Sequence, residues 1–201
     1  LTGPVGHHAA LNGLLLPVLQ RRGWQVELWA DQACSPTAAP LPGLRSLLRD
    51  AGYLDPRDWG DLPGSLHQAS LLRPQLEAAA AGEPVAVWLA HSLLPFQLIA
   101  LAHVLQRQPP AQVVVSLMFA PGEVFAGQPE HDLLAQRHTA QAASRAALAA
   151  LRLASAKAGH RLLLAAGSRQ LCDRYNELCS AVGLEPPLLH PYTPPPRRAR
   201  R

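Results

Sequence analysis

Residues able to do chemistry gather at a few places in this sequence, and the first is near its start. Gly3 and Gly6 enclose a short loop, which His7 and His8 follow directly. A Gly-x-x-Gly loop ahead of a helix lets the backbone approach a ligand closely, and the helix N-terminus favours anions, phosphate above all. The loop therefore predicts a phosphate contact, against the plainer reading that the glycines only turn the chain.

The second place follows the apolar run 84–90, PVAVWLA, which ends at His91 and Ser92. Such a continuous run is typical of a strand covered on both faces of a parallel sheet, and ligands bind beyond the carboxyl ends of such strands. We expect His91 and Ser92 to line a cleft; the alternative for His91 is a hydrogen-bonded histidine at a buried strand end. Glu123 lies in a later loop on the same edge, where it contacts substrate or is a plain loop acid.

Metal chemistry has little support in the sequence. His7 and His8 are neighbours whose side chains point apart, and no third ligand accompanies them. The cysteines, Cys34, Cys172 and Cys179, form no Cys-x-x-Cys pair. The last two lie roughly 10 Å apart along a predicted helix, too far for a disulfide. A reduced, cytosolic protein without a metal is predicted.

The elements that must position these residues alternate between helix and strand. An apolar helical face ends at a basic turn before Gly23, and Pro17 inside it predicts a kink or an early break. The remaining pattern predicts strands at 24–30, 84–90, 112–119 and 160–166, a short helix at 44–51, and longer helices at 66–81, 95–108, 132–158 and 167–182, the last ending at Gly183.

This alternation requires right-handed crossovers and a parallel sheet. The predicted fold class is α/β, a Rossmann-like three-layer α/β/α arrangement with a mainly parallel sheet. Its first strand is missing, because a glycine loop of this kind normally follows a strand and the sequence opens inside the loop. We expect one domain over 1–190, followed by a Pro/Arg-rich linker or tail over 191–201.

Charge and hydropathy exclude several function classes. The net charge is +4, and four arginines in 197–201 account for all of it, so residues 1–196 sum to zero. Aromatic residues make up 5% and are not interleaved with basic ones, which argues against nucleic-acid binding. Polar residues and Pro95 interrupt the apolar run 85–105, and no signal peptide is evident. We predict a cytoplasmic protein, at most peripheral to the inner face of the membrane through its basic tail.

Three segments together resemble the N-terminal, acceptor-side domain of GT-B-fold glycosyltransferases of the family-4-like group. They are LTGPVGHHAALNGLLLPVLQRRGWQVELWA at 1–30, VAVWLAHSLLPFQLIALAHVL at 85–105 and LLLAAGSRQLCDRYNELCSAVGLEPPLLHPYTPPP at 162–196. The resemblance covers most of residues 1–196 and rests on the order and spacing of these segments.

The resemblance implies transfer of a sugar from a nucleotide-sugar donor to the hydroxyl of a lipid or polysaccharide acceptor, with no metal or other cofactor. The loop of Gly3 and Gly6, with the backbone around His7 and His8, would face the donor diphosphate. His91 matches the cleft histidine near the transferred sugar, where it would donate or accept a hydrogen bond or, less readily, act as a general base. Ser92 and Glu123 are assigned to substrate.

The sequence departs from that family in lacking the second domain, whose paired glutamates grip the donor. We therefore expect the lone chain to be inactive and to need a complementary C-terminal domain as its partner. Two other functions stay open. One is a non-catalytic Rossmann-like interaction module; the other is a dinucleotide-dependent reductase, against which the spacing Gly-x-x-Gly, rather than Gly-x-Gly-x-x-Gly, counts.

Overall fold

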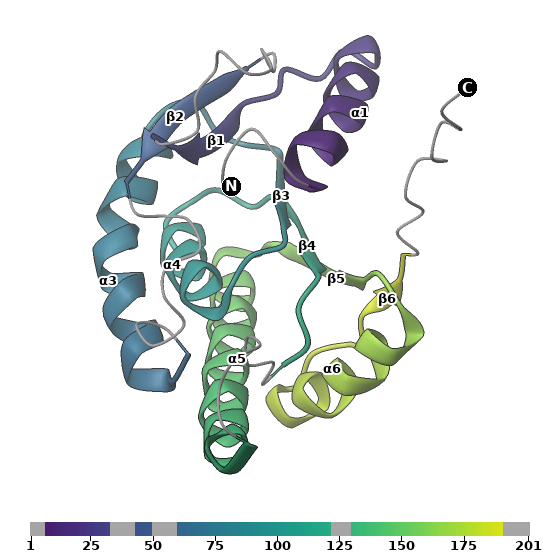
Figure 1. The fold of residues 1–201 in the computed structure, drawn as a ribbon. Helices are drawn as coiled ribbons and strands as arrows, with labels where there is room; N and C mark the ends of the chain where they lie inside the picture. Colours follow the sequence, from purple (N-terminus) through teal and green to yellow (C-terminus); the bar gives the residue numbers. More distant parts are fainter. Residues whose placement is uncertain (1–6, 33–42, 50–59, 122–129, 191–201) are drawn as a thin grey trace, which may run out of the picture.

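A computed structural model describes residues 7–32, 43–49, 60–121 and 130–190, with the backbone alone for 7–11 and 130–140. Helices and strands alternate along it (Figure 1). In chain order they are α1 (His7–Arg21), β1 (Leu28–Asp31), β2 (Leu44–Leu48), α3 (Leu62–Ala79), β3 (Val87–His91), α4 (Pro95–Leu105), β4 (Gln112–Leu117), α5 (Glu130–Ala158), β5 (Arg161–Ala166), α6 (Arg169–Val182) and β6 (Leu188–Leu189).

All strand pairs in the described residues are parallel, and they form two sheets. One contains β1 and β2; the other has the order β3-β4-β5-β6. Each pair in the larger sheet is joined by a helix, as parallel strands require. The α/β class with a mainly parallel sheet, predicted from the alternation of patterns, is confirmed, and the fold is a Rossmann-like three-layer α/β/α arrangement.

The helices form layers on the strands. α3, α4 and α5 pack against one another, and Figure 1 shows α1 across the strands from α4 and α5. One apolar core lies between the helices and the strands. It includes Leu48 of β2, Val113 and Val115 of β4, and Leu164 of β5. The two sheets therefore share a single core.

Capping residues set several helix ends. Asp61 accepts a hydrogen bond from the Gly64 N–H at 2.7 Å and starts α3, and Ser168 accepts from the Leu171 N–H at 3.2 Å and starts α6. Gly183, at a φ of 70°, ends α6 as the pattern predicted, because the left-handed conformation there suits glycine.

Two expectations were wrong. Residues 44–48 form strand β2 rather than part of a helix, because pairing with β1 and burial of Leu48 outweigh a weak helical pattern. Of the two outcomes predicted for Pro17, the early break is wrong, since α1 runs unbroken from His7 to Arg21. Element bounds also shift: β1 covers 28–31, so it starts four residues later and ends one residue later than the predicted strand at 24–30, and α3 starts at 62 rather than 66.

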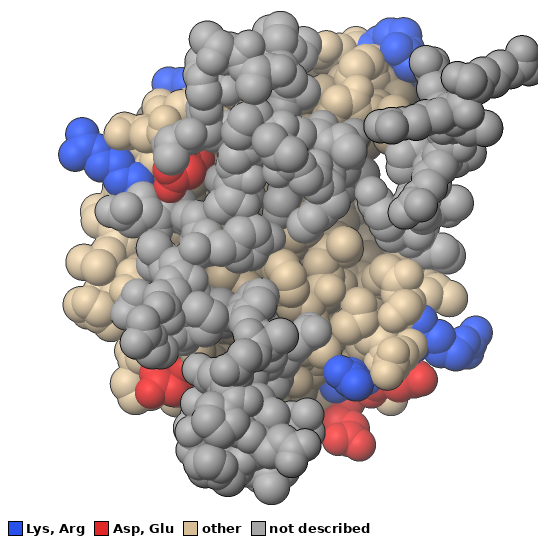
Figure 2. All heavy atoms as spheres, viewed as in Figure 1, with Lys and Arg blue, Asp and Glu red and all other residues tan. Residues whose placement is uncertain are grey.

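On the face in Figure 2 the described charged side chains lie around the rim, and uncharged residues occupy the described centre. Within the described part of the chain, no helix combines the length and apolar character that crossing a bilayer needs.

Burial in α6 predicts a difference in reactivity between two cysteines. Cys179 has no exposed surface and Cys172 is half-buried. Burial raises the pKa of the Cys179 thiol from 9.0 to about 11, so at pH 8 it stays protonated and unreactive. Alkylation of the native protein, read site by site by mass spectrometry, should modify Cys172 and spare Cys179. Equal labelling of the two would contradict this packing of α6.

Candidate functional site

The candidate site is built where helix α1 meets the end of strand β3. His91 is the last residue of β3, and its Nε2 lies 3.3 Å from Oδ1 of Asn12 in α1. Both side chains are buried, at 8% and 5% exposure. A carboxamide oxygen only accepts hydrogen bonds, so His91 donates from Nε2 and its ring is fixed in orientation.

Ser92 continues from His91 into a sharp turn toward α4. Its φ is 57°, the one positive value among the described residues other than glycine, and its side chain is 3% exposed. The Ser92 N–H donates to the Ser116 carbonyl at 3.1 Å, which ties the end of β3 to the end of β4. Left-handed backbone at a residue with a β-carbon costs about 1–2 kcal/mol, and such strain concentrates at functional sites.

Further residues fix the same edge of the larger sheet. The Tyr175 hydroxyl of α6 donates to the Phe119 carbonyl at 2.8 Å, which holds the segment that leaves β4. The start of α6, capped by Ser168, follows the carboxyl end of β5. The carboxyl ends of β3, β4 and β5 therefore form one edge, the edge at which parallel α/β sheets bind ligands.

The structure places some of the predicted site residues at this edge, and others lie outside the described residues. His91 and Ser92 lie together at this edge, as predicted, and the start of α1 is beside them, because Asn12 is about 8 Å along the helix from His7. His7 and His8 form the first turn of α1. Gly3, Gly6 and Glu123 lie outside the described residues, so their predicted contacts stay predictions.

Asn12 is the site residue that sequence reasoning missed. It stands in the otherwise apolar stretch AALNGLLL, and the structure buries it beside Leu16 on the inner side of α1. A buried polar side chain must be hydrogen-bonded, so a lone asparagine on an apolar helix face is a signal of a specific polar partner. That signal could have been read from the sequence, although its partner could not.

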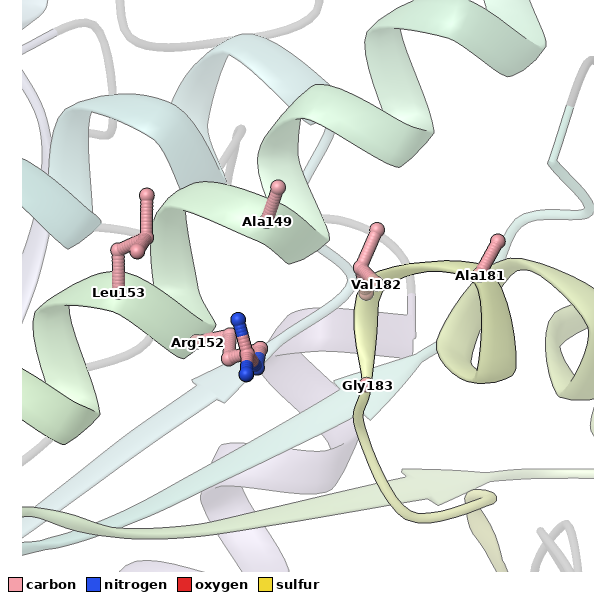
Figure 3. A pocket seen from close by; sticks show the side chains of 6 residues that line it. All are labelled: Ala149, Arg152, Leu153, Ala181, Val182 and Gly183. Carbon is pink, nitrogen blue, oxygen red and sulfur yellow. The ribbon is translucent and has the colours of Figure 1, made fainter.

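A surface hollow of about 430 Å³ lies elsewhere, between α5 and α6 (Figure 3). Its lining residues are Ala149, Arg152, Leu153, Ala181, Val182 and Gly183. Gly183 ends α6, and α6 runs back from the carboxyl edge of the sheet, so the hollow is at the amino edge. It is shallow, and the polar groups around His91 are far from it in the fold, so we do not assign it to the candidate site. Among the described residues, His, Cys, Asp and Glu form no cluster of three or more that could hold a metal ion.

Substitutions at Ser92 test whether the turn holds residue 92 in the left-handed backbone conformation. Ser92→Val should be less stable than Ser92→Gly by about 2 kcal/mol, because a β-branched side chain is strained at this φ and glycine is not. The measurement is the midpoint of urea unfolding followed by circular dichroism. Equal midpoints for the two variants would mean that the turn does not hold residue 92 in the left-handed region.

Comparison with protein-family models, with curated proteins and with solved structures finds no match to this chain.

Proposed function

We propose that this chain is the acceptor-side half of a metal-independent GT-B-type glycosyltransferase. Completed by a second domain, it transfers a sugar from a nucleotide-sugar donor to a hydroxyl of a lipid or polysaccharide acceptor. The observation that carries the proposal is the Asn12–His91 contact, because it sets the start of a helix beside a polar strand end at the edge where α/β sheets bind ligands.

Each part of this edge suits one part of the donor. Backbone N–H groups at the start of α1, with the loop that contains Gly3 and Gly6, suit the diphosphate and would stabilise the leaving nucleotide phosphate. The hydrogen bond between Nε2 and Asn12 orients the His91 ring at this edge, where His91 would hydrogen-bond to the transferred sugar. Ser92, at the adjacent turn, adds a hydroxyl to the same wall.

On this proposal the edge forms one wall of a cleft, and we expect the lone chain to be inactive. Transition-state stabilisation needs donors aimed at developing charge in a site closed to water. The described residues supply a polar strand end and a helix start on one side. A donor-binding domain docked over this edge would close the other side.

The test combines this chain with the donor-binding domain of a GT-B glycosyltransferase, added separately or fused after Arg201. Nucleotide release is measured over a panel of nucleotide sugars and lipid or glycan acceptors. We expect release only in the combination, and His91→Ala should lower its rate about tenfold, which is the worth of one hydrogen bond of roughly 1.4 kcal/mol.

His67→Ala is the matched control, because His67 is exposed on α3 and should leave the rate unchanged. An unchanged rate in His91→Ala would remove His91 from the site. No release with any donor domain, acceptor or nucleotide sugar would overturn the proposal and favour the competing function, a non-catalytic interaction module.

A further inference from the structure

The hollow between α5 and α6 has the composition of a small binding site, although it lies away from the candidate site. Its volume of about 430 Å³ falls within the range of small-molecule pockets, roughly 300–1,000 Å³. Arg152 is the one charged residue among the described residues that line it, and the others are alanine, leucine, valine and glycine. Pockets of this kind hold a ligand by apolar contact and orient it with a few polar groups.

The guanidinium of Arg152 is held against the end of α6. A Cβ built on Gly183 would stand 3.2 Å from Nε of Arg152, a distance at which it would crowd the guanidinium. Figure 3 shows this guanidinium between α5 and the turn at Gly183. The glycine that ends α6 therefore also gives the cation its place in the hollow.

The charge of Arg152 has no acidic partner in the part of the chain that the structure describes. The acids that flank the end of α6 in sequence, Glu177 and Glu185, are exposed, and neither lines the hollow. A cation beside a helix C-terminus also offsets the helix dipole, and this is the plainer role for Arg152. Its fork of N–H donors nevertheless matches a carboxylate, which can accept two of them at once.

The rest of the wall sets the chemistry of the ligand. Leu153 is 60% exposed, while Ala149 and Val182 are half-buried. Their side chains have no hydrogen-bonding group, so the wall gives a sugar or a nucleotide no partner for its polar atoms. An acyl chain would cover Leu153 and bring no polar group that needs a partner.

We propose that this hollow binds an acyl carboxylate, with the carboxylate on Arg152 and the apolar chain across Ala149, Leu153 and Val182. The inference is independent of the proposed function, because the hollow lies at the opposite edge of the sheet from His91. One side of the ligand stays in water, so we expect a dissociation constant of about 1–10 mM for a ligand of roughly ten non-hydrogen atoms.

The experiment uses octanoate as the probe and 1-octanol as its neutral control. Each is titrated into the full chain at about 0.15 M salt, and binding is followed by NMR shifts of the backbone amides. We expect octanoate to shift the amides of Leu153 and Val182. It should bind about fivefold more tightly than octanol, which is the upper worth of an exposed ion pair.

Three variants separate the carboxylate contact from general attraction. Arg152→Gln should weaken octanoate about fivefold and leave octanol unchanged, so that the two bind alike. Arg145→Gln is the matched control, because Arg145 is an exposed arginine two turns earlier on α5 that does not line the hollow, and both affinities should stay the same. Ala181→Phe fills the hollow from an exposed position and should weaken both probes about tenfold, the worth of roughly two buried methylene groups, with the urea midpoint unchanged.

Equal affinity of octanoate and octanol for the unaltered chain would overturn the proposal, because Arg152 would then only offset the helix dipole. Equal losses in Arg152→Gln and Arg145→Gln would also overturn it, since net charge and not the hollow would attract octanoate. Shifts that gather on amides outside the lining, or that begin only when octanoate forms micelles, would remove the hollow as the site.

Discussion

Replacing His160 with alanine should lower the free energy of unfolding by about 3 kcal/mol. The side chain is 8% exposed and bonded at both ring nitrogens. The Ala111 N–H donates to Nδ1 at 3.0 Å, and Nε2 donates to the Leu105 carbonyl at 2.7 Å. Truncation leaves the Ala111 N–H without its partner in the core, which costs about 1–3 kcal/mol, and it removes one of two donors to the Leu105 carbonyl, which also accepts from the Gln108 N–H. The loss of the buried ring's packing adds to this cost.

His160 acts at a junction of three elements, which is why its loss should affect the whole fold. It precedes β5, while its two partners lie at the end of α4 and just ahead of β4. The measurement is equilibrium unfolding in urea. His103→Ala is the matched control, because His103 makes a single bond, from Nδ1 to the Ile99 carbonyl in its own helix, and should cost under about 1 kcal/mol. Equal costs for the two variants would contradict a bridging role for His160.

The comparison of His91 with His160 shows what the sequence could predict about the site. Each histidine borders an apolar strand, so composition does not separate them. The direction of the strand separates the two histidines. His91 ends β3, at the edge where parallel sheets bind ligands, and His160 comes before β5, at the opposite edge. The parallel sheet, predicted from alternation alone, is therefore enough to place His91, and not His160, at the edge where such sheets bind ligands.

The central strands were predictable because each contains a continuous apolar run, which indicates a buried strand. VVV in β4 and LLL in β5 are short apolar runs typical of a strand covered on both faces of a parallel sheet. Strand β2 was not predictable in this way. Its residues, LRSLL, have no alternation, and they form a strand because β1 lies beside them and Leu48 enters the core. The local sequence pattern does not predict the secondary structure of a segment that becomes a strand only by pairing with a neighbouring strand.

The partner of His91 was beyond the sequence for a similar reason. Asn12 and His91 are far apart in the chain, and they meet because α1 crosses near the end of β3. The apolar periodicity of α1 predicts which side of the helix is buried. It does not predict how far along the strand the helix sits, since that depends on the packing of the whole layer.

Replacing Ala147 with phenylalanine should lower the free energy of unfolding by about 3 kcal/mol, the upper part of the range for overpacking a close-packed core. Ala147 has no exposed surface and lies in α5, which packs against α4. Ala100 and Ala102 of α4 are equally inaccessible. The alanine-rich composition of α5 is thus a packing requirement as well as a helix preference, because small side chains let the two helices approach closely.

Ala156→Phe is the matched control, because Ala156 lies in the same helix and is exposed. Its cost should stay within about 0.5 kcal/mol, the usual range for surface substitutions. Unfolding in urea, with circular dichroism and tryptophan fluorescence as two probes, measures both variants. If the two substitutions cost the same, α4 and α5 are not packed closely at Ala147, and the alanines of α5 reflect helix propensity alone.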